Sequence, residues 1–249
     1  MLKRIMIVFG LTVTVAAVSF FTLSRRTVFR MLVAQAASGP ITPFTARTTM
    51  TQFDKDGQVT ATEVMINAVR SDGSQVMLRE SINNRSVGAK SLVDVPSRKR
   101  ISVDPLTRSI TTYSLAADDI AALRPQPSAC NGGERNNIQG RDVFQKATDE
   151  VFGEKNQHRE SWLAPELGCF PLRSKVTLSV NGMLKLTKTE EVFLLVVGEP
   201  DRSLFAVPAD YTERSPSEVF RERARIKGTT CRECDSAGQK LDEAYRSHQ

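Results

Sequence analysis

The sequence has few of the residues and motifs on which enzyme active sites depend. Its 249 residues include two histidines, and because His248 is the penultimate residue, a catalytic triad would have to use His158. The sequence contains no nucleophile elbow, glycine-rich phosphate loop, dinucleotide fingerprint or His-Glu-x-x-His zinc motif. Adjacent carboxylates such as Glu190 and Glu191 point to opposite faces of a strand, and we interpret them as solvated charges. We therefore predict no catalytic residue, no metal site and no cofactor, with an enzyme whose site forms only in three dimensions as an alternative.

The excess of basic residues does not extend over the whole chain. The formal net charge is +6, from 34 basic and 28 acidic residues. Five of the basic residues lie within residues 1–36, which contain no acidic residue, so 29 basic residues stand against 28 acidic ones in the rest of the chain. A nucleic-acid-binding surface needs positive charge clustered on the folded domain. The charge pattern therefore gives no reason to expect nucleic acid as a partner.

The N-terminus holds a long hydrophobic run without charge. Residues Ile5 to Leu23 would span about 28 Å as a helix, close to the thickness of a bilayer core. Apolar regions of signal peptides are usually about 7–15 residues long, so this length favours a retained membrane anchor. A cleaved signal is the alternative, because Ala34-Gln35-Ala36 has the small-x-small form of a cleavage site. In either case we expect the rest of the chain to lie outside the cytoplasm, on the periplasmic side of the cell envelope.

Four cysteines agree with an oxidising compartment, in which thiols form disulfides. Cys130 and Cys169 each lie beside glycine, 39 positions apart, and we predict that they pair. Cys231 and Cys234 form a Cys-x-x-Cys motif, for which we favour a local disulfide or two surface thiols. A thioredoxin-like redox site needs βαβ connections upstream, and a zinc site would lack a fourth ligand even with His248, so both are disfavoured.

From Pro43 onward, short segments of β-type composition are separated by Gly, Pro and Asn turn signals. The expected strands are residues 44–53, 59–69, 75–82, 90–95, 100–103, 109–115, 141–152, 158–163, 172–180 and 183–197. Asn181-Gly182 is the strongest hairpin signal among the turns. Because Phe193 to Val197 is apolar at every position, we expect it to be buried on both sides. Residues 128–140 are polar and rich in Gly and Asn, which is typical of a loop.

Helical signals in the remaining chain are short. Asp118 to Leu123 could form one or two turns, Ser217 to Lys227 is rich in helix formers, and Ser236 to Ser247 could close the chain as a second helix. We therefore predict a mainly β protein: a curved antiparallel sheet or half-barrel, with an N-terminal transmembrane or signal helix and short C-terminal helices. The expected domain limits are 1–36 for the membrane segment, 37–212 for the β-rich domain and 213–249 for a helical, partly flexible tail.

Two segments carry a distinctive signature. The first is Glu160-Ser161-Trp162-Leu163-Ala164-Pro165-Glu166-Leu167-Gly168, and the second runs from Gly198-Glu199-Pro200-Asp201 through Ser203-Leu204-Phe205 to Val207-Pro208-Ala209-Asp210-Tyr211. Both segments resemble a group of uncharacterised exported bacterial proteins. The long antiparallel strands, the Trp-containing central strand and the closing segment also look like periplasmic lipoprotein carriers of the LolA/LolB-like class. That resemblance implies a half-open sheet that holds acyl chains, and it transfers no functional residue to this sequence.

We expect the signature residues to have structural roles. The set comprises Trp162, Pro165, Gly168, Pro200, Leu204, Phe205, Pro208 and Tyr211. Trp162 is expected to help fill the core and Pro165 to end a strand, because proline cannot donate a ladder hydrogen bond. Leu204 and Phe205 are expected to tuck the exit segment under the sheet.

The functional hypothesis follows from the expected sheet and its place beside a membrane. Nine apolar residues are expected to supply one sheet face: Val59, Met65, Val76, Leu78, Ile101, Ile110, Val176, Leu178 and Leu184. One short C-terminal helix would not cover such a face, and an uncovered apolar concavity can hold an apolar or lipid-like ligand. We therefore predict a non-enzymatic binding module, attached to the membrane by its N-terminal segment. The alternative is a structural or protein–protein interaction module of an envelope assembly, whose partner covers the same face.

Overall fold

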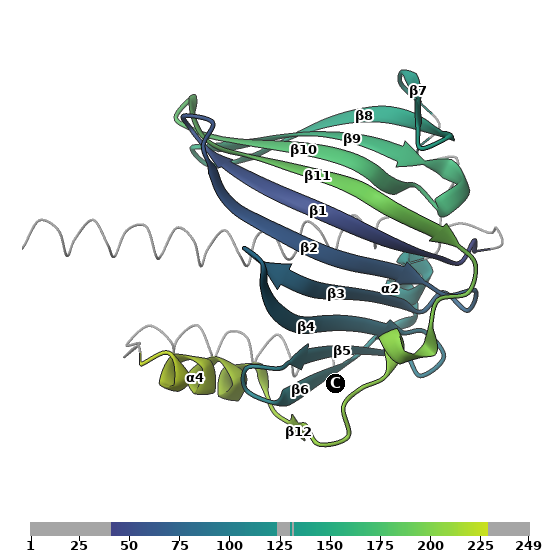
Figure 1. The fold of residues 1–249 in the computed structure, drawn as a ribbon, viewed down its shortest axis with the longest axis vertical. Coiled ribbons are helices and arrows are strands. Elements are labelled where there is room, and N and C mark those ends of the chain that lie inside the picture. The colour runs from purple at the N-terminus through teal and green to yellow at the C-terminus, as the bar shows by residue number, and fades with distance from the viewer. Residues whose placement is uncertain (1–40, 124–129, 131, 229–249) are drawn as a thin grey trace, which may run out of the picture.

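The computed structural model describes residues 41–123, 130 and 132–228 (Figure 1). The predicted membrane segment Ile5 to Leu23, the Cys231–Cys234 motif and the helix expected over Ser236 to Ser247 lie outside these residues. Among the described helices there is none with the length and apolar character needed to cross a bilayer.

Twelve strands form one sheet in the spatial order β12-β6-β5-β4-β3-β2-β1-β11-β10-β9-β8-β7. The strands are β1 (Phe44–Asp54), β2 (Val59–Val69), β3 (Gln75–Ile82), β4 (Arg85–Asp94), β5 (Lys99–Asp104), β6 (Ser109–Ser114), β7 (Arg135–Ile138), β8 (Arg141–Phe152), β9 (Lys155–Ala164), β10 (Phe170–Val180), β11 (Met183–Val197) and β12 (Thr212–Glu213). The sheet is curved and unclosed, with β7 and β12 at opposite edges (Figure 1). The predicted mainly β fold with a curved antiparallel sheet is confirmed.

The sheet consists of two meanders that meet in its middle. Strands β1 to β6 follow one another as antiparallel neighbours, and so do β7 to β11. One antiparallel pair, β1 with β11, joins the two meanders along the whole length of β1. The short β12 runs parallel to β6 and is the exception to the antiparallel pattern. The order of the sheet therefore depends on a pairing between segments far apart in the sequence.

The tight turns form where the sequence supplies residues that tolerate positive φ. Asn181 and Gly182, at the β10–β11 hairpin, have φ angles of 51° and 74°. Two consecutive positive φ angles define the turn that matches the right-handed twist of paired strands, and Asn-Gly is its favoured sequence. The hairpin predicted from this pair is confirmed.

Strand limits agree with the prediction along most of the chain. β2, β3, β8 and β11 have the expected limits, whereas β4 begins five residues earlier, at Arg85. β7 lies within the segment interpreted as a loop, so that interpretation is wrong for Arg135–Ile138. These four residues form a strand because they pair with β8 across a turn at Gln139 and Gly140, both with positive φ.

The expectation that Phe193 to Val197 is buried on both sides is wrong. The exposed fractions are 52% for Phe193, 47% for Leu194, 56% for Val196 and 45% for Val197. The segment that follows β11 packs on Ala68, Val76 and Leu92 of strands β2 to β4 and not on β11. A strand that is apolar on both faces is therefore not necessarily buried on both faces, because no other segment need pack on it.

Two α-helices and two 3-10 turns complete the described chain. They are α2 (Ala117–Ala122), α4 (Pro216–Ile226), η1 (Pro165–Leu167) and η2 (Arg202–Phe205). A capping box begins α4: the Ser215 N–H donates to Glu218 Oε2 (2.8 Å), and Ser215 Oγ accepts from the Glu218 N–H (3.4 Å). Arg223 of α4 donates to buried Asp104 at the end of β5, which fixes the helix to the sheet.

Candidate binding site

The two faces of the sheet differ in burial. We call the face that carries Phe44, Thr48 and Met50 the inner face, and the face that carries Arg47 and Thr49 the outer face. Phe44, Ala46, Thr48 and Met50 are all buried, whereas the β1 residues between them are half-buried. The same alternation continues in β10. Most of the buried strand side chains therefore belong to the inner face, on which a site shielded from water would lie.

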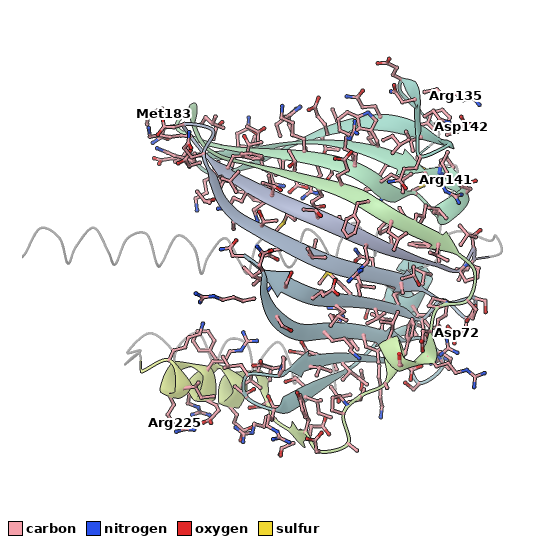
Figure 2. The ribbon with its side chains drawn as sticks, in the orientation of Figure 1. Asp72, Arg135, Arg141, Asp142, Met183 and Arg225 are labelled. Atoms are coloured by element: carbon pink, nitrogen blue, oxygen red, sulfur yellow. A yellow bond between two sulfur atoms is a disulfide. The ribbon has the colours of Figure 1, made fainter. Side chains whose placement is uncertain are left out.

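The inner face is apolar at one end. There the largest core cluster joins the inner-face residues Phe44, Ala46, Val69 and Val192 to residues at the ends of β8, β9 and β10 and in η1, namely Val143, Ala164, Leu167, Phe170 and Leu172. The rings of Phe44 and Phe170 pack with their centroids 4.8 Å apart. By the strand register this end lies opposite the hairpin tip that carries Met183 (Figure 2). We call this region the apolar end.

A row of charged side chains crosses the middle of the inner face, and we call it the charged row. Its members are Glu63 of β2, Arg79 of β3, Arg159 of β9, and Lys188 and Glu190 of β11. Glu63 Oε2 lies 2.9 Å from Arg79 Nε, and Ser174 Oγ donates to Glu190 Oε2 at 3.0 Å. Met50 stands between Glu63 and Glu190 in the strand register. The row therefore extends from β3 to β9, across six of the twelve strands of the sheet.

Burial sets the electrostatics of the charged row. Loss of hydration lowers the pKa of Lys188 against the opposing effect of Glu190 and Glu63, while Arg79 and Arg159 lower it further. Loss of hydration also lowers the pKa of Arg159, against the opposing charges of Glu190 and Glu150. Groups with perturbed pKa values collect at functional sites and in structural ion-pair networks. The row is therefore the candidate site for the polar part of a ligand.

The structure corrects the interpretation of Glu190 as a solvated charge. Glu190 is half-buried on the inner face, whereas Glu191 is exposed on the outer face and pairs with Arg173 at 2.6 Å. The polar residues of β11 between Lys185 and Glu191 give both faces a polar pattern, so the sequence shows no sign of which face is buried. None of the five members of the charged row is predicted from the sequence.

The nine apolar residues expected on one face are divided between the two. The strand registers place Met65, Val176 and Leu178 on the inner face. The other six lie on the outer face: Val59, Val76, Leu78, Ile101, Ile110 and Leu184. The expectation of one continuous apolar face is therefore wrong. The hydrophobic content of a strand does not show which face of the sheet its apolar side chains occupy.

The first signature segment forms the end of β9 and the turn after it. Trp162 packs against the apolar cluster, and the Arg173 guanidinium lies 5.9 Å from its ring centroid. Pro165 begins η1 directly after the strand, and Gly168 ends η1 with a φ of 67°. Cys169 follows and is joined by a disulfide to Cys130, the pairing predicted from the sequence.

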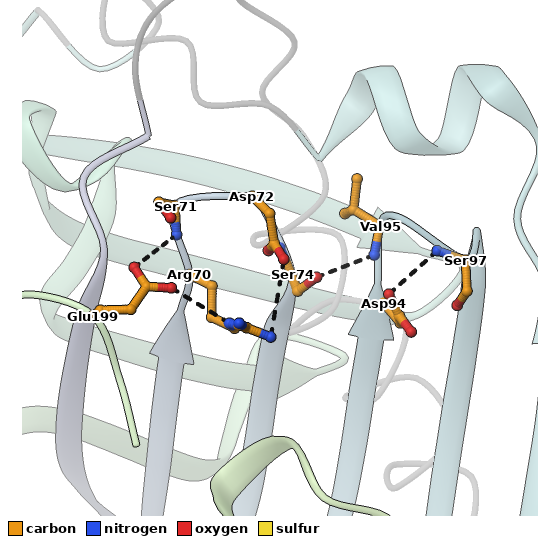
Figure 3. A network of polar contacts seen from close by, with 8 residues as sticks. All are labelled: Arg70, Ser71, Asp72, Ser74, Asp94, Val95, Ser97 and Glu199. Atoms are coloured by element: carbon orange, nitrogen blue, oxygen red, sulfur yellow. Dashed lines mark hydrogen bonds and ion pairs between the residues drawn. The ribbon is translucent and has the colours of Figure 1, made fainter. Parts of the chain in front are cut away.

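The second signature segment crosses the outer face. Leu204 and Phe205 of η2 pack on the cluster around Val76, and the Arg70 guanidinium lies 5.3 Å from the Phe205 ring centroid. Glu199 fastens the start of the segment, since it accepts from the Ser71 N–H at 3.3 Å and from Arg70 Nε at 3.4 Å (Figure 3). The remaining signature residues are Pro200, which is buried, and Pro208 and Tyr211, which are half-buried.

His158, the histidine considered for catalysis, lies on the outer face. Its Nδ1 is 2.9 Å from Asp149 Oδ1 on the neighbouring strand β8. Thr177 of β10 is its partner in the sheet register on the other side. His158 therefore stands away from the charged row, which occupies the opposite face.

Comparisons with known proteins find similar solved structures but no similar sequence family. Neither a family model nor a curated protein matches the sequence. The structure is similar to PNGF-II, with a TM-score of 0.44 and 14% identity; the match covers 74% of this chain and 34% of PNGF-II. It is similar to an uncharacterised conserved protein from Thermus thermophilus, with a TM-score of 0.43 and 10% identity; the match covers 77% of this chain and 98% of that protein. It is also similar to a LolA superfamily protein from Nitrosomonas europaea, with a TM-score of 0.35 and 8% identity; the match covers 74% of this chain and 97% of that protein. This chain thus spans about a third of the length of PNGF-II.

Proposed function

We propose that the protein is a non-enzymatic binding module of the bacterial cell envelope, and that a lipid-like amphiphile binds along its inner face. The observation that carries this proposal is the division of the inner face into an apolar end and a charged row. A ligand with an apolar chain and a polar head would match both parts, whereas a purely apolar ligand would leave the charges desolvated.

The disulfide supports the proposed location outside the cytoplasm. Cys130 and Cys169 are joined with 2% and 3% of their surface exposed. Disulfides of this kind persist in oxidising compartments such as the periplasm. Attachment through Ile5 to Leu23, and the division of the chain at residues 36 and 212, stay predictions from the sequence.

Site-specific photo-crosslinking in intact cells would test the ligand. A photoreactive amino acid at Leu178 would face inward, and the same amino acid at the neighbouring Thr177 would face outward. We expect mass spectrometry to find lipid adducts at position 178 and far fewer at position 177. Absence of lipid adducts at position 178 would contradict the proposed function.

A second candidate function is that of an interaction module in an envelope assembly. It is favoured by the apolar strip on the outer side of β11, where Phe193, Leu194 and Val196 are each about half exposed. Contiguous exposed apolar surface often marks a protein contact. A photoreactive amino acid at Leu194 that yields a single protein adduct, together with no lipid adduct at Leu178, would favour this function over the first.

A further inference from the structure

Three strands place a compact group of mostly polar side chains on the inner face. The residues that face inward are Gln157, Arg159 and Ser161 of β9, Ser174, Val176 and Leu178 of β10, and Leu186, Lys188 and Glu190 of β11. The register aligns Ser161 with Ser174 and Glu190, and Arg159 with Val176 and Lys188. Directly opposed residues in antiparallel strands have Cβ atoms about 5 Å apart. This three-by-three arrangement, which we call the inner patch, is small enough for one ligand head to touch several members.

Two members of the inner patch have buried polar atoms without a hydrogen-bond partner. Among the contacts of the described chain, neither Ser161 Oγ nor Gln157 Nε2 has one. Ser161 is 2% exposed, so bulk water does not satisfy its hydroxyl group. Both groups can donate, since a serine carries an O–H and a glutamine amide two N–H groups. Buried donors are normally satisfied in folded proteins, and their position on the inner face indicates an acceptor that binds there.

The charges beside these donors favour an acceptor that is an anion. Arg159 lies between Gln157 and Ser161 on the same face of β9, and Lys188 lies one strand beyond Val176. Glu190, the carboxylate of the patch, already accepts the hydroxyl of Ser174. Donors to an anion form charge-assisted hydrogen bonds, which are stronger than bonds between neutral groups. Val176 and Leu178 supply apolar contact beside the same donors.

We propose that the inner patch binds the anionic head of an amphiphile, a carboxylate or a phosphate, through Ser161, Gln157, Arg159 and Lys188. This inference rests on the proposed function and adds the class of head group. An uncharged head of similar size would lack the charge-assisted hydrogen bonds and would bind more weakly.

Binding to the full-length chain, kept in a non-ionic detergent, would test the head group. The probes are oleate and 1-oleoyl-lysophosphatidate as anionic amphiphiles, monoolein as an uncharged amphiphile with the same acyl chain, and inorganic phosphate as a free anion. We expect the two anionic amphiphiles to bind at least about tenfold more tightly than monoolein in native mass spectrometry, and free phosphate to bind more weakly still. Equal binding of monoolein would overturn the anionic head and leave the proposed function standing. Loss of all amphiphile binding would overturn both.

Matched variants separate the inner patch from the charge of the whole protein. Lys188→Met removes an inward cation, and Lys175→Met removes an outward cation from the adjacent strand. We expect Lys188→Met to lose the preference for oleate over monoolein and Lys175→Met to keep it. Ser161→Ala removes a buried hydroxyl that has no hydrogen-bond partner among the described residues, so the variant should fold, and we expect weaker oleate binding with unchanged monoolein binding. An unchanged preference in both Lys188→Met and Ser161→Ala, or phosphate binding as tight as that of lysophosphatidate, would overturn the proposal.

Discussion

The two faces of β11 have an arrangement opposite to that of most half-buried strands. Lys188 and Glu190 point to the buried inner face, while Phe193, Leu194 and Val196 have about half of their surface in contact with solvent. Antiparallel strands usually place apolar side chains inward and polar ones outward. A protein that keeps charges inside and apolar groups outside retains them at a cost in stability. The proposed ligand on the inner face and the proposed partner on the outer face would each account for part of this arrangement.

An irregularity in the strand pairing produces part of this arrangement. The register between β1 and β11 shifts at Arg47 and Thr48, so that Arg47 pairs with Leu194 and Thr48 with Val192. Phe193 is the extra residue between them. A bulge of one residue changes which face the following side chains occupy. Val192 is therefore buried on the inner face, and Leu194, two positions later, is exposed on the outer face.

The largest difference between the faces should appear in two phenylalanine substitutions. Phe44 is 1% exposed and packs on Phe170, so we expect Phe44→Ala to lower the free energy of unfolding by about 3–5 kcal/mol. Phe193→Ala on the outer face should change it by about 0.5 kcal/mol or less. Urea denaturation measures both variants. Comparable losses would show that the outer strip also contributes to the core.

The disulfide should stabilise the apolar end by a similar amount. Cys130 and Cys169 are buried with Leu163, and the bond closes a loop with a sequence separation of 39. Replacing both cysteines by serine should therefore lower the free energy of unfolding by about 3–4 kcal/mol in the chain-entropy model. The matched control is the double serine variant of Cys231 and Cys234, a predicted local pair whose loss should cost less. Non-reducing peptide mapping checks the pairs, and free thiols at positions 130 and 169 would contradict the first.

Inner and outer carboxylates should differ in their contribution to stability. Glu63 is 6% exposed and lies 2.9 Å from Arg79, and we expect Glu63→Gln to cost about 1.5–3 kcal/mol because the half-buried Arg79 loses its buried counter-charge. Glu191→Gln breaks an exposed pair with Arg173 and should cost less than about 1 kcal/mol. Thermal unfolding of the two variants gives the comparison. An equal effect would show that the inner pair is hydrated.

The smallest expected effect concerns the attachment of α4 and depends on pH. Burial of Asp104 opposes its ionisation, but hydrogen bonds from Arg223, Thr107 and the Leu106 N–H, with the charge of Arg223, outweigh it and hold the pKa of Asp104 below its ordinary value. This contribution to stability is present above the unfolded pKa of about 3.9 and is lost as pH falls through the lower folded pKa. Asp104→Asn should therefore cost about 1–2 kcal/mol at neutral pH and less in acid.

The control for Asp104 is Asp210→Asn, which breaks an exposed pair with Arg108. We expect that variant to follow the wild-type pH dependence of unfolding between pH 6 and the acid limit. If Asp104→Asn also follows the wild-type pH dependence of unfolding, the bond between Asp104 and Arg223 does not hold α4 on the sheet.

The sequence by itself determined the features that depend on neighbouring residues. The Asn181-Gly182 turn, most strand limits, the start of the helix near Ser217 and the Cys130–Cys169 pair all follow from local chemistry or from the cysteine inventory. The turn, the strand limits and the helix start depend on backbone propensity and alternation among neighbouring residues, which a single sequence displays directly. The cysteine pair is separated by 39 positions and was expected from the small number of cysteines and their glycine-containing surroundings. The mainly β class could be predicted for the same reason, whereas the curvature of the sheet was expected from the resemblance to the lipoprotein carriers.

Only the tertiary structure decided which residues are buried and what lies beside them. β7 exists through its pairing with β8, and the charged row forms because β1 pairs with β2 and β11 and so places Glu63 and Glu190 on either side of Met50. The bulge at Phe193 then places Val192 on the inner face and Leu194 on the outer face. Long-range register and bulges depend on partners distant in the sequence, so the alternation within one strand shows that two faces exist but not which one is covered.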